Sequence, residues 1–186
     1  MATTTIVIDK IAAAVTATGV KLVEANSDFF TDGESLHFDH GHMVEITGKL
    51  LKKNKSKMKY PLIILVEDID QYNYAGMLHY NLRLFIVNFN PREQDDSPQR
   101  WAKGGVIKGR LLPIYEEFLR QISAKGFSWD KAETPGVTPP HTFTVRTKFG
   151  VWLRELNGTV RNMLTDPLDA IEIQDLKINT KALSCV

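Results

Sequence analysis

The sequence predicts an α+β fold in which helices cover one mostly antiparallel β-sheet. Residues 110–126 carry apolar side chains at three- and four-residue steps, which places them on one face of a helix. Two apolar runs, Tyr60–Glu67 and Tyr80–Asn88, precede this helix and are typical of buried strands. Since an amphipathic helix must bury its apolar stripe, we expect it to pack on the sheet that the two runs form.

Size and composition allow one domain with a substantial core. The chain has 186 residues, and its net charge of +1 argues against a protein that binds nucleic acid or membranes through bulk charge. No apolar run approaches the ~20 residues of a membrane helix, and the N-terminus shows no secretory signal. Cys185 is the one cysteine, so we expect no internal disulfide, no cysteine nucleophile and a reducing compartment. We predict a single domain over residues 1–186.

The first half of the chain alternates between short helical and extended patterns. Residues 5–18 predict a helix that stops at Gly19, and 20–25 and 29–38 predict short extended pieces joined by turns. From residue 43 to 51 the apolar spacing predicts a second short helix. The two apolar runs that we expect to form strands, Tyr60–Glu67 and Tyr80–Asn88, follow it.

The central helix has clear signals at both ends. Pro113 fits the first turn, because its missing N–H is not needed there, so the regular helix begins near Leu112. Gly126 is placed for a left-handed cap after Lys125.

Two more strands are predicted towards the C-terminus. Residues 141–149 alternate, which predicts a half-exposed antiparallel strand with a common apolar face made of Phe143, Val145, Thr147 and Phe149. Residues 170–181 also alternate, but Leu176 and Ile178 are one step out of phase with Ile171 and Ile173. One extra residue at Gln174-Asp175, a β-bulge, would restore the face.

Three segments have the composition of long loops, at about residues 68–79, 90–105 and 127–140. In the second of these we expect Trp101 to anchor the loop. Aromatic and methionine side chains on such loops suit contacts with other protein chains, but they equally suit packing of each loop on its own domain. The candidate subunit or partner contacts are Tyr72, Tyr74, Met77 and Trp101.

The one strong local charge bias is a lysine run between residues 49 and 59. Lysines at this density can neutralise phosphates, but a solvated helix end followed by a soluble loop explains them as well. The candidate DNA-contacting residues are Lys52, Lys53, Lys55 and Lys57.

A cluster of histidines is the most chemically suggestive feature. His37, Asp39, His40 and His42 lie close together, and Glu34 or His79 could add a further metal ligand. The spacing matches no established ligand pattern, so we favour a polar turn. The adjacent carboxylates Glu116 and Glu117 do not face each other on a helix, and we expect both on a solvated face. We therefore predict no catalytic residue, no cofactor and no metal, and a protein that is not an enzyme.

Several longer phrases resemble a known family of structural proteins. They are KYPLIILVED, LRLFIVNFN, RLLPIYEEFLRQISAKGF, HTFTVRTKFG and DAIEIQDLKINTK. In this order they resemble the tail terminator and tail-completion proteins of tailed bacteriophages, over about residues 5–181. The resemblance lies in element order and phrasing, and it includes no catalytic signature.

The resemblance implies a non-enzymatic virion protein that is assembled in the host cytoplasm. Such proteins form a ring, commonly a hexamer, that caps the tail tube and joins it to the head connector while DNA passes through. The implied partners are further copies of the chain, the tail tube protein and connector or stopper proteins, with no membrane. The lysine run would then line the lumen. Alternatives are a connector or stopper of the neck, a metal-dependent enzyme built on the histidine cluster, and a small adaptor for a partner such as nucleic acid.

Overall fold

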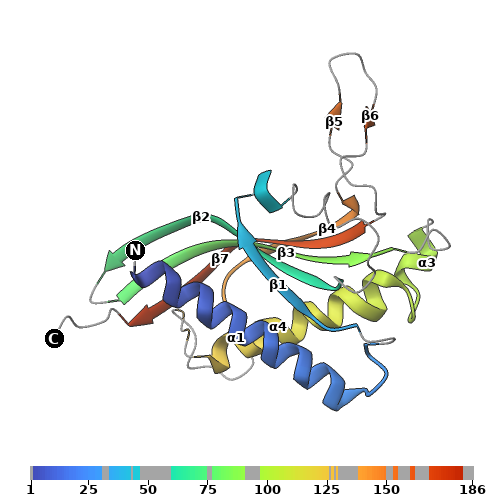
Figure 1. The fold of residues 1–186 in the computed structure, drawn as a ribbon, viewed down its shortest axis with the longest axis horizontal. Helices are drawn as coiled ribbons and strands as arrows, with labels where there is room; N and C mark the ends of the chain where they lie inside the picture. The colour runs from blue at the N-terminus through green and yellow to red at the C-terminus, as the bar shows by residue number, and fades with distance from the viewer. Residues whose placement is uncertain are drawn as a thin grey trace.

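A five-stranded mixed sheet forms the centre of the protein, with strand order β1-β2-β3-β7-β4 (Figure 1). The strands are β1 (His37–Gly41), β2 (Leu62–Tyr74), β3 (Met77–Phe89), β7 (Leu168–Lys181) and β4 (Thr142–Phe149). The computed structural model describes residues 2–30, 34–42, 44–46, 60–74, 77–90, 97–125, 127, 129, 138–149, 153–154, 160–161 and 168–181.

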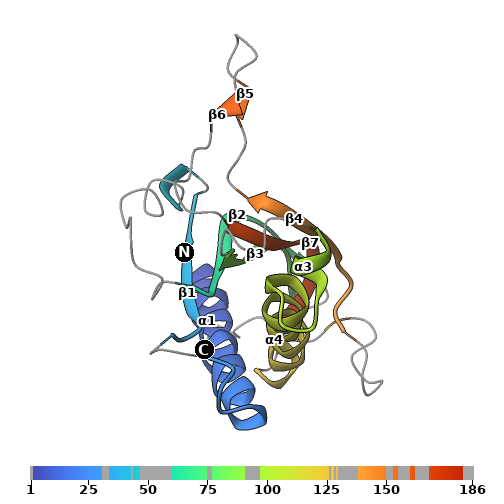
Figure 2. The ribbon, with the colours of Figure 1, turned by 90° about the vertical axis from the view of Figure 1, so that its right-hand side faces the viewer.

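The sheet is mostly antiparallel, which confirms the predicted fold class. Strand β1 pairs with β2 in parallel, whereas the β2–β3, β3–β7 and β7–β4 pairs are antiparallel. Two further short strands, β5 (Leu153–Arg154) and β6 (Val160–Arg161), pair with each other only. In both ribbon views this small sheet lies away from the five-stranded sheet (Figures 1 and 2).

Two long helices cover the same face of the sheet, as Figure 2 shows end-on. They are α1 (Ala2–Ala25) and α4 (Leu112–Ala124), and they pack against each other. A π-helical segment, η3 (Val106–Leu111), leads directly into α4, and Pro113 stands in the first turn of α4 as predicted. The short helix α3 (Ser97–Trp101) precedes η3. None of the helices within the described residues is long and apolar enough to cross a membrane.

The core has two parts, one on each face of the sheet. On the helix side, α1 and α4 pack on alternate residues of the strands, among them Ile63, Leu65, Leu84, Ile86, Ile171 and Ile173. On the opposite side a smaller cluster includes Ile46, Tyr60, Ile64, Phe85, Phe149 and Leu168. The runs 62–66 and 84–87 are therefore buried on both faces, which is why they are continuously apolar.

The bulge predicted in the last strand is present. Leu84 pairs with Ile173 and Leu82 with Leu176, so β7 has one more residue than β3 between these pairs. Asp175 takes the left-handed conformation with φ 54°. Because of this extra residue, Leu176 and Ile178 return to the helix-covered face together with Ile171 and Ile173.

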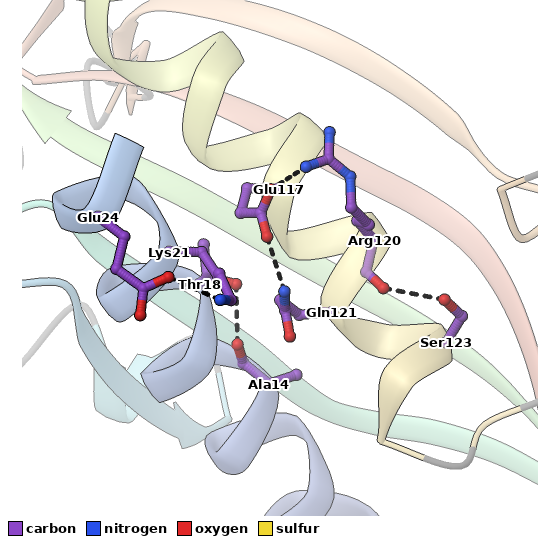
Figure 3. Close-up of polar contacts among 8 residues, drawn as sticks. All are labelled: Ala14, Thr18, Lys21, Glu24, Glu117, Arg120, Gln121 and Ser123. Atoms are coloured by element: carbon purple, nitrogen blue, oxygen red, sulfur yellow. Dashed lines mark hydrogen bonds and ion pairs between the residues drawn. The ribbon is translucent and has the colours of Figure 1, made fainter. Parts of the chain in front are cut away.

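Figure 3 shows the polar contacts where α1 and α4 meet. Thr18 is fully buried, and its hydroxyl donates to the Ala14 carbonyl oxygen at 2.8 Å. Glu117 is buried as well and accepts from Arg120 at 2.5 Å and from Gln121 at 2.7 Å. The expectation of a solvated face was thus wrong for Glu117 and right for Glu116, which is exposed. Neighbouring residues on a helix lie 100° apart, so one can enter an interface that the other avoids.

Other element predictions need correction. The first helix is longer than predicted and includes residues 20–25, which were expected to be extended. Residues 68–79 are mostly strand, since β2 runs to Tyr74 and β3 begins at Met77. Residues 70–73 of this hairpin are exposed, and a run of polar residues such as these is also typical of a loop.

Two further corrections concern the segments around the central helix. The expected loop at 90–105 contains α3. Phe149 lies on the face opposite Val145, because the β4–β7 register is irregular between Arg146 and Phe149. Gly126, most of 127–140 and most of the predicted helix at 43–51 lie outside the described residues, although 44–46 are helical.

A larger side chain at the α1–α4 contact tests this packing. Ala14 is fully buried and neighbouring Ala13 is exposed. We expect Ala14→Leu to lower the free energy of unfolding by about 1–3 kcal/mol because it overpacks the interface. The matched change Ala13→Leu should have almost no effect. Urea unfolding followed by circular dichroism measures both, and equal effects of the two changes would contradict the helix placement.

Candidate functional site

A three-residue ionic cluster lies on the sheet face opposite the helices. Glu172 of β7 is fully buried, and arginines from the two neighbouring strands bind it, each with a side chain that is 40% exposed. Arg83 of β3 donates through Nε at 2.8 Å and Nη2 at 2.5 Å to one carboxylate oxygen, and Arg146 of β4 donates through Nε to the other. Gln174 adds a fourth hydrogen bond at 2.7 Å. The cluster thus ties three strands together through side chains.

The environment of Glu172 favours its charged form. Burial by itself raises the pKa of Glu172, but hydrogen bonds from Gln174, Arg146 and Arg83 outweigh it and hold the pKa below the ordinary value of 4.5. A depressed pKa in the folded state means that the carboxylate stabilises the fold above pH 4.5. This contribution is lost as the pH falls through the folded-state pKa.

A second buried ion pair lies at the other side of β7. Arg100 of α3 reaches Asp169 at 3.2 Å, and both side chains are almost fully buried. The sequence placed the anchor of this region at Trp101, but Trp101 is 44% exposed. The prediction that Trp101 anchors the segment was therefore wrong, and Arg100 takes that role. Moving Arg100 away would leave Asp169 buried without this partner, which is costly, and no local sequence pattern reveals the distant partner.

The edge strand β4 carries an aromatic cluster where it meets α4. Tyr115 of α4 hydrogen-bonds His141 Nε2 at 2.6 Å, and its ring lies 5.0 Å from the ring of Phe143. His141 Nδ1 lies 2.6 Å from the carbonyl oxygen of Pro139. A carbonyl only accepts, so Nδ1 carries a proton and a neutral ring accepts the Tyr115 hydroxyl at Nε2.

This arrangement orients Tyr115 and fixes the start of β4. Burial, and secondarily the charge of Glu116, raise the pKa of Tyr115, so the hydroxyl remains a donor at neutral pH. Phe143 is 48% exposed next to it, and Thr142 and Thr144 are exposed too. The start of β4 therefore presents an aromatic side chain on an outer strand of the sheet.

The histidine cluster does not converge. Alternation along β1 separates His37 and Asp39 from His40, whose Nδ1 lies 2.6 Å from Glu67 Oε1. His42 Nδ1 accepts from the Val44 amide at 3.3 Å. Within the part of the chain that the structure describes, no three His, Cys, Asp or Glu side chains are placed to hold a metal ion.

The predicted contact residues do not form one patch. Tyr72 is 60% exposed and stacks on His79 at 4.7 Å near the β2–β3 turn, where Tyr74 pairs in register with Met77. Helix α3, which ends at Trp101, lies at the opposite end of the sheet (Figure 1). Tyr72 and Trp101 thus remain candidates for two separate contacts. The candidate DNA-contacting residues Lys52, Lys53, Lys55 and Lys57 lie outside the described residues.

Sequence reasoning missed Arg83, Arg146 and Glu172 as a cluster. The signal available was a charged residue inside each of three otherwise apolar or alternating strands. Strand order and register decide whether such charges meet, and neither can be read from local pattern. Comparisons of the chain with protein-family models, with curated proteins and with solved structures give no match.

The Glu172 cluster predicts a specific pH dependence. Glu172→Gln should lower the free energy of unfolding by about 1–3 kcal/mol at pH 7, because two arginines lose their carboxylate partner. The difference from the wild type should begin to shrink below the ordinary pKa of 4.5 and should vanish below the folded-state pKa, where the wild-type carboxylate is protonated as well. Exposed Glu116→Gln is the control. A difference that stays constant from pH 7 to pH 3 would contradict the assigned role.

The Tyr115–His141 hydrogen bond can be tested by removing one oxygen atom. Tyr115→Phe should lower the free energy of unfolding by about 1 kcal/mol, since it removes the bond and leaves the ring packing on Phe143 intact. Thermal unfolding monitored by circular dichroism gives the value. A variant as stable as the wild type would show that this bond does not hold the start of β4.

Proposed function

We propose that this protein is a virion structural protein of a tailed phage or prophage, which assembles into a ring at the head–tail junction as a tail terminator or tail-completion protein. The family resemblance in the sequence supports this proposal, and one structural observation carries it. That observation is the outer edge of the sheet at β4, which has the features of a contact between subunits.

Strand β4 has a partner on one side only. Within the described residues it pairs with β7 and no strand lies beyond it. An open strand edge presents backbone N–H and C=O groups on which another chain can pair, and monomeric proteins commonly protect such edges with charge. The first residues of β4, Thr142–Val145, carry no charge, and Phe143 is half-exposed there.

A ring of identical subunits requires a heterologous interface, in which one surface of each copy contacts a different surface of the next. The β4 edge with Phe143 supplies one such surface. The chain's net charge of +1 allows many copies to assemble without strong mutual repulsion. Terminator, connector and stopper rings share this requirement. The sequence segments that carry the resemblance favour the terminator.

The test is the oligomeric state of the purified protein and of two matched variants. Phe143→Glu places a charge on the proposed interface. Val44→Glu is the control, because it places a charge on an apolar side chain that is 72% exposed and lies outside β4. Size-exclusion chromatography with light scattering should give a multimer, commonly a hexamer, for the wild type and for Val44→Glu. Phe143→Glu should shift the mass towards the monomer by at least tenfold in dissociation constant, which is about 1.4 kcal/mol.

Two outcomes would contradict the proposal. One is a wild-type protein that stays monomeric at the highest soluble concentration and forms no rings in negative-stain electron micrographs. The other is equal dissociation of both variants, which would mean that the β4 edge has no special role. Circular dichroism of each variant verifies that it is folded.

A further inference from the structure

The two outer strands of the five-stranded sheet differ in length and charge. Strand β4 has eight residues, and its first half, Thr142–Val145, carries no charge. Strand β1, at the other side of the sheet, has five residues and contains Asp39. Within the described residues no strand lies beyond β1. Since an open strand edge can pair with another chain, the outer edge of β1 decides whether copies can also join on this side.

The pairing of β1 with β2 determines which of its backbone groups point outwards. In a parallel pair, every second residue directs its N–H and C=O groups to the neighbouring strand. The His37 N–H donates to the Pro61 carbonyl oxygen at 3.0 Å, so the odd-numbered residues of β1 face β2. Phe38 and His40 therefore direct their backbone groups to the outer edge. A strand added there would have only these two amide donors to bind.

The side chain of Asp39 occupies one of the two donors. The His40 N–H donates to Asp39 Oδ1 at 2.9 Å. The carboxylate thus takes the place at which a carbonyl oxygen of an added strand would accept. Carboxylate and carbonyl oxygens both only accept, so they repel each other at this position. An added strand would also take the charged group out of water, which costs free energy.

The surroundings of Asp39 oppose strand addition as well. His40 Nδ1 lies 2.6 Å from Glu67 Oε1, and the two side chains are 43% and 44% exposed. Gly41 has a φ of 148°, which few other residues adopt, and the strand ends there. Short length and charged side chains are the usual means by which sheet proteins protect an edge. β1 has both features, whereas the first half of β4 has neither.

We propose that Asp39 closes the β1 edge to strand addition and thereby prevents copies of the chain from joining β4 to β1. Strands β1, β2 and β7 run in one direction and β3 and β4 in the other, so β4 of one copy and β1 of the next can meet as an antiparallel pair. Such head-to-tail contacts form open filaments when the rotation between copies does not close. That a ring needs this protection rests on the function proposed above, but the closed edge is a property of the single chain.

The test compares two substitutions of the same residue. Asp39→Ala removes the acceptor and exposes the His40 amide, whereas Asp39→Asn keeps an oxygen at the same place. Sedimentation velocity should show that Asp39→Ala raises the average mass above that of the wild type by about twofold or more, because each contact adds a further copy. Asp39→Asn should sediment like the wild type. Asp9→Ala, which removes an exposed carboxylate of α1, is the matched control and should leave the mass unchanged.

Association through β4 and β1 should be reversible on dilution, and Phe143→Glu should abolish it in the Asp39→Ala background. Circular dichroism verifies that each variant is folded. Asp39→Val, which suits a strand and lacks an acceptor, should act like Asp39→Ala and replaces it if alanine weakens the fold.

A folded Asp39→Ala with the mass of the wild type would overturn the proposal, as would equal association of Asp39→Ala and Asp39→Asn. Growth that persists with Phe143→Glu would also overturn it, because β4 would then not be the partner. A monomeric wild type would contradict the proposed ring alone. In that case Asp39→Ala should still form chains.

Discussion

The fold depends on which face of the sheet the apolar side chains of β7 occupy. Strand β7 lies between β3 and β4 and contributes Ile171, Ile173, Leu176 and Ile178 to the core beneath the helices. Since successive strand residues point to opposite faces, the three-residue step from Ile173 to Leu176 would put the two pairs on opposite faces of a regular strand. The bulge at Gln174-Asp175 absorbs the extra residue, so all four share the helix-covered face. In a regular strand of the same sequence, one half would turn its apolar side chains to the other face.

The same arrangement leaves the opposite face chemically mixed. Near Phe85 and Leu168 that face is apolar and buried, whereas around Glu172 it carries charges. Each buried carboxylate there or nearby has an arginine partner, as in Arg83–Glu172–Arg146 and Arg100–Asp169. Buried charges are stable only with such partners, so these pairs fix which strands and helices lie side by side.

Much of the fold could be predicted from local pattern, because the relevant signals are periodic. The central helix, the doubly apolar strands and the bulge all follow from the spacing of apolar residues, and the structure agrees with each. The end of the β2–β3 hairpin was predicted as a loop, since its exposed residues 70–73 are polar like those of a loop. The candidate site could not be predicted from the sequence. Arg83, Arg146 and Glu172 come together only because β3, β7 and β4 are neighbours in the sheet.

Deletion of single residues from β7 tests the central claim most directly. If Asp175 is the extra residue of the bulge, its deletion should leave a regular strand with all four apolar side chains still under the helices. The account therefore predicts a folded protein within about 2 kcal/mol of the wild type by urea unfolding. Deletion of Lys177 should instead turn Ile178 to the wrong face and cost more than deletion of Asp175. Loss of the fold on deletion of Asp175, or no difference between the two deletions, would contradict the account.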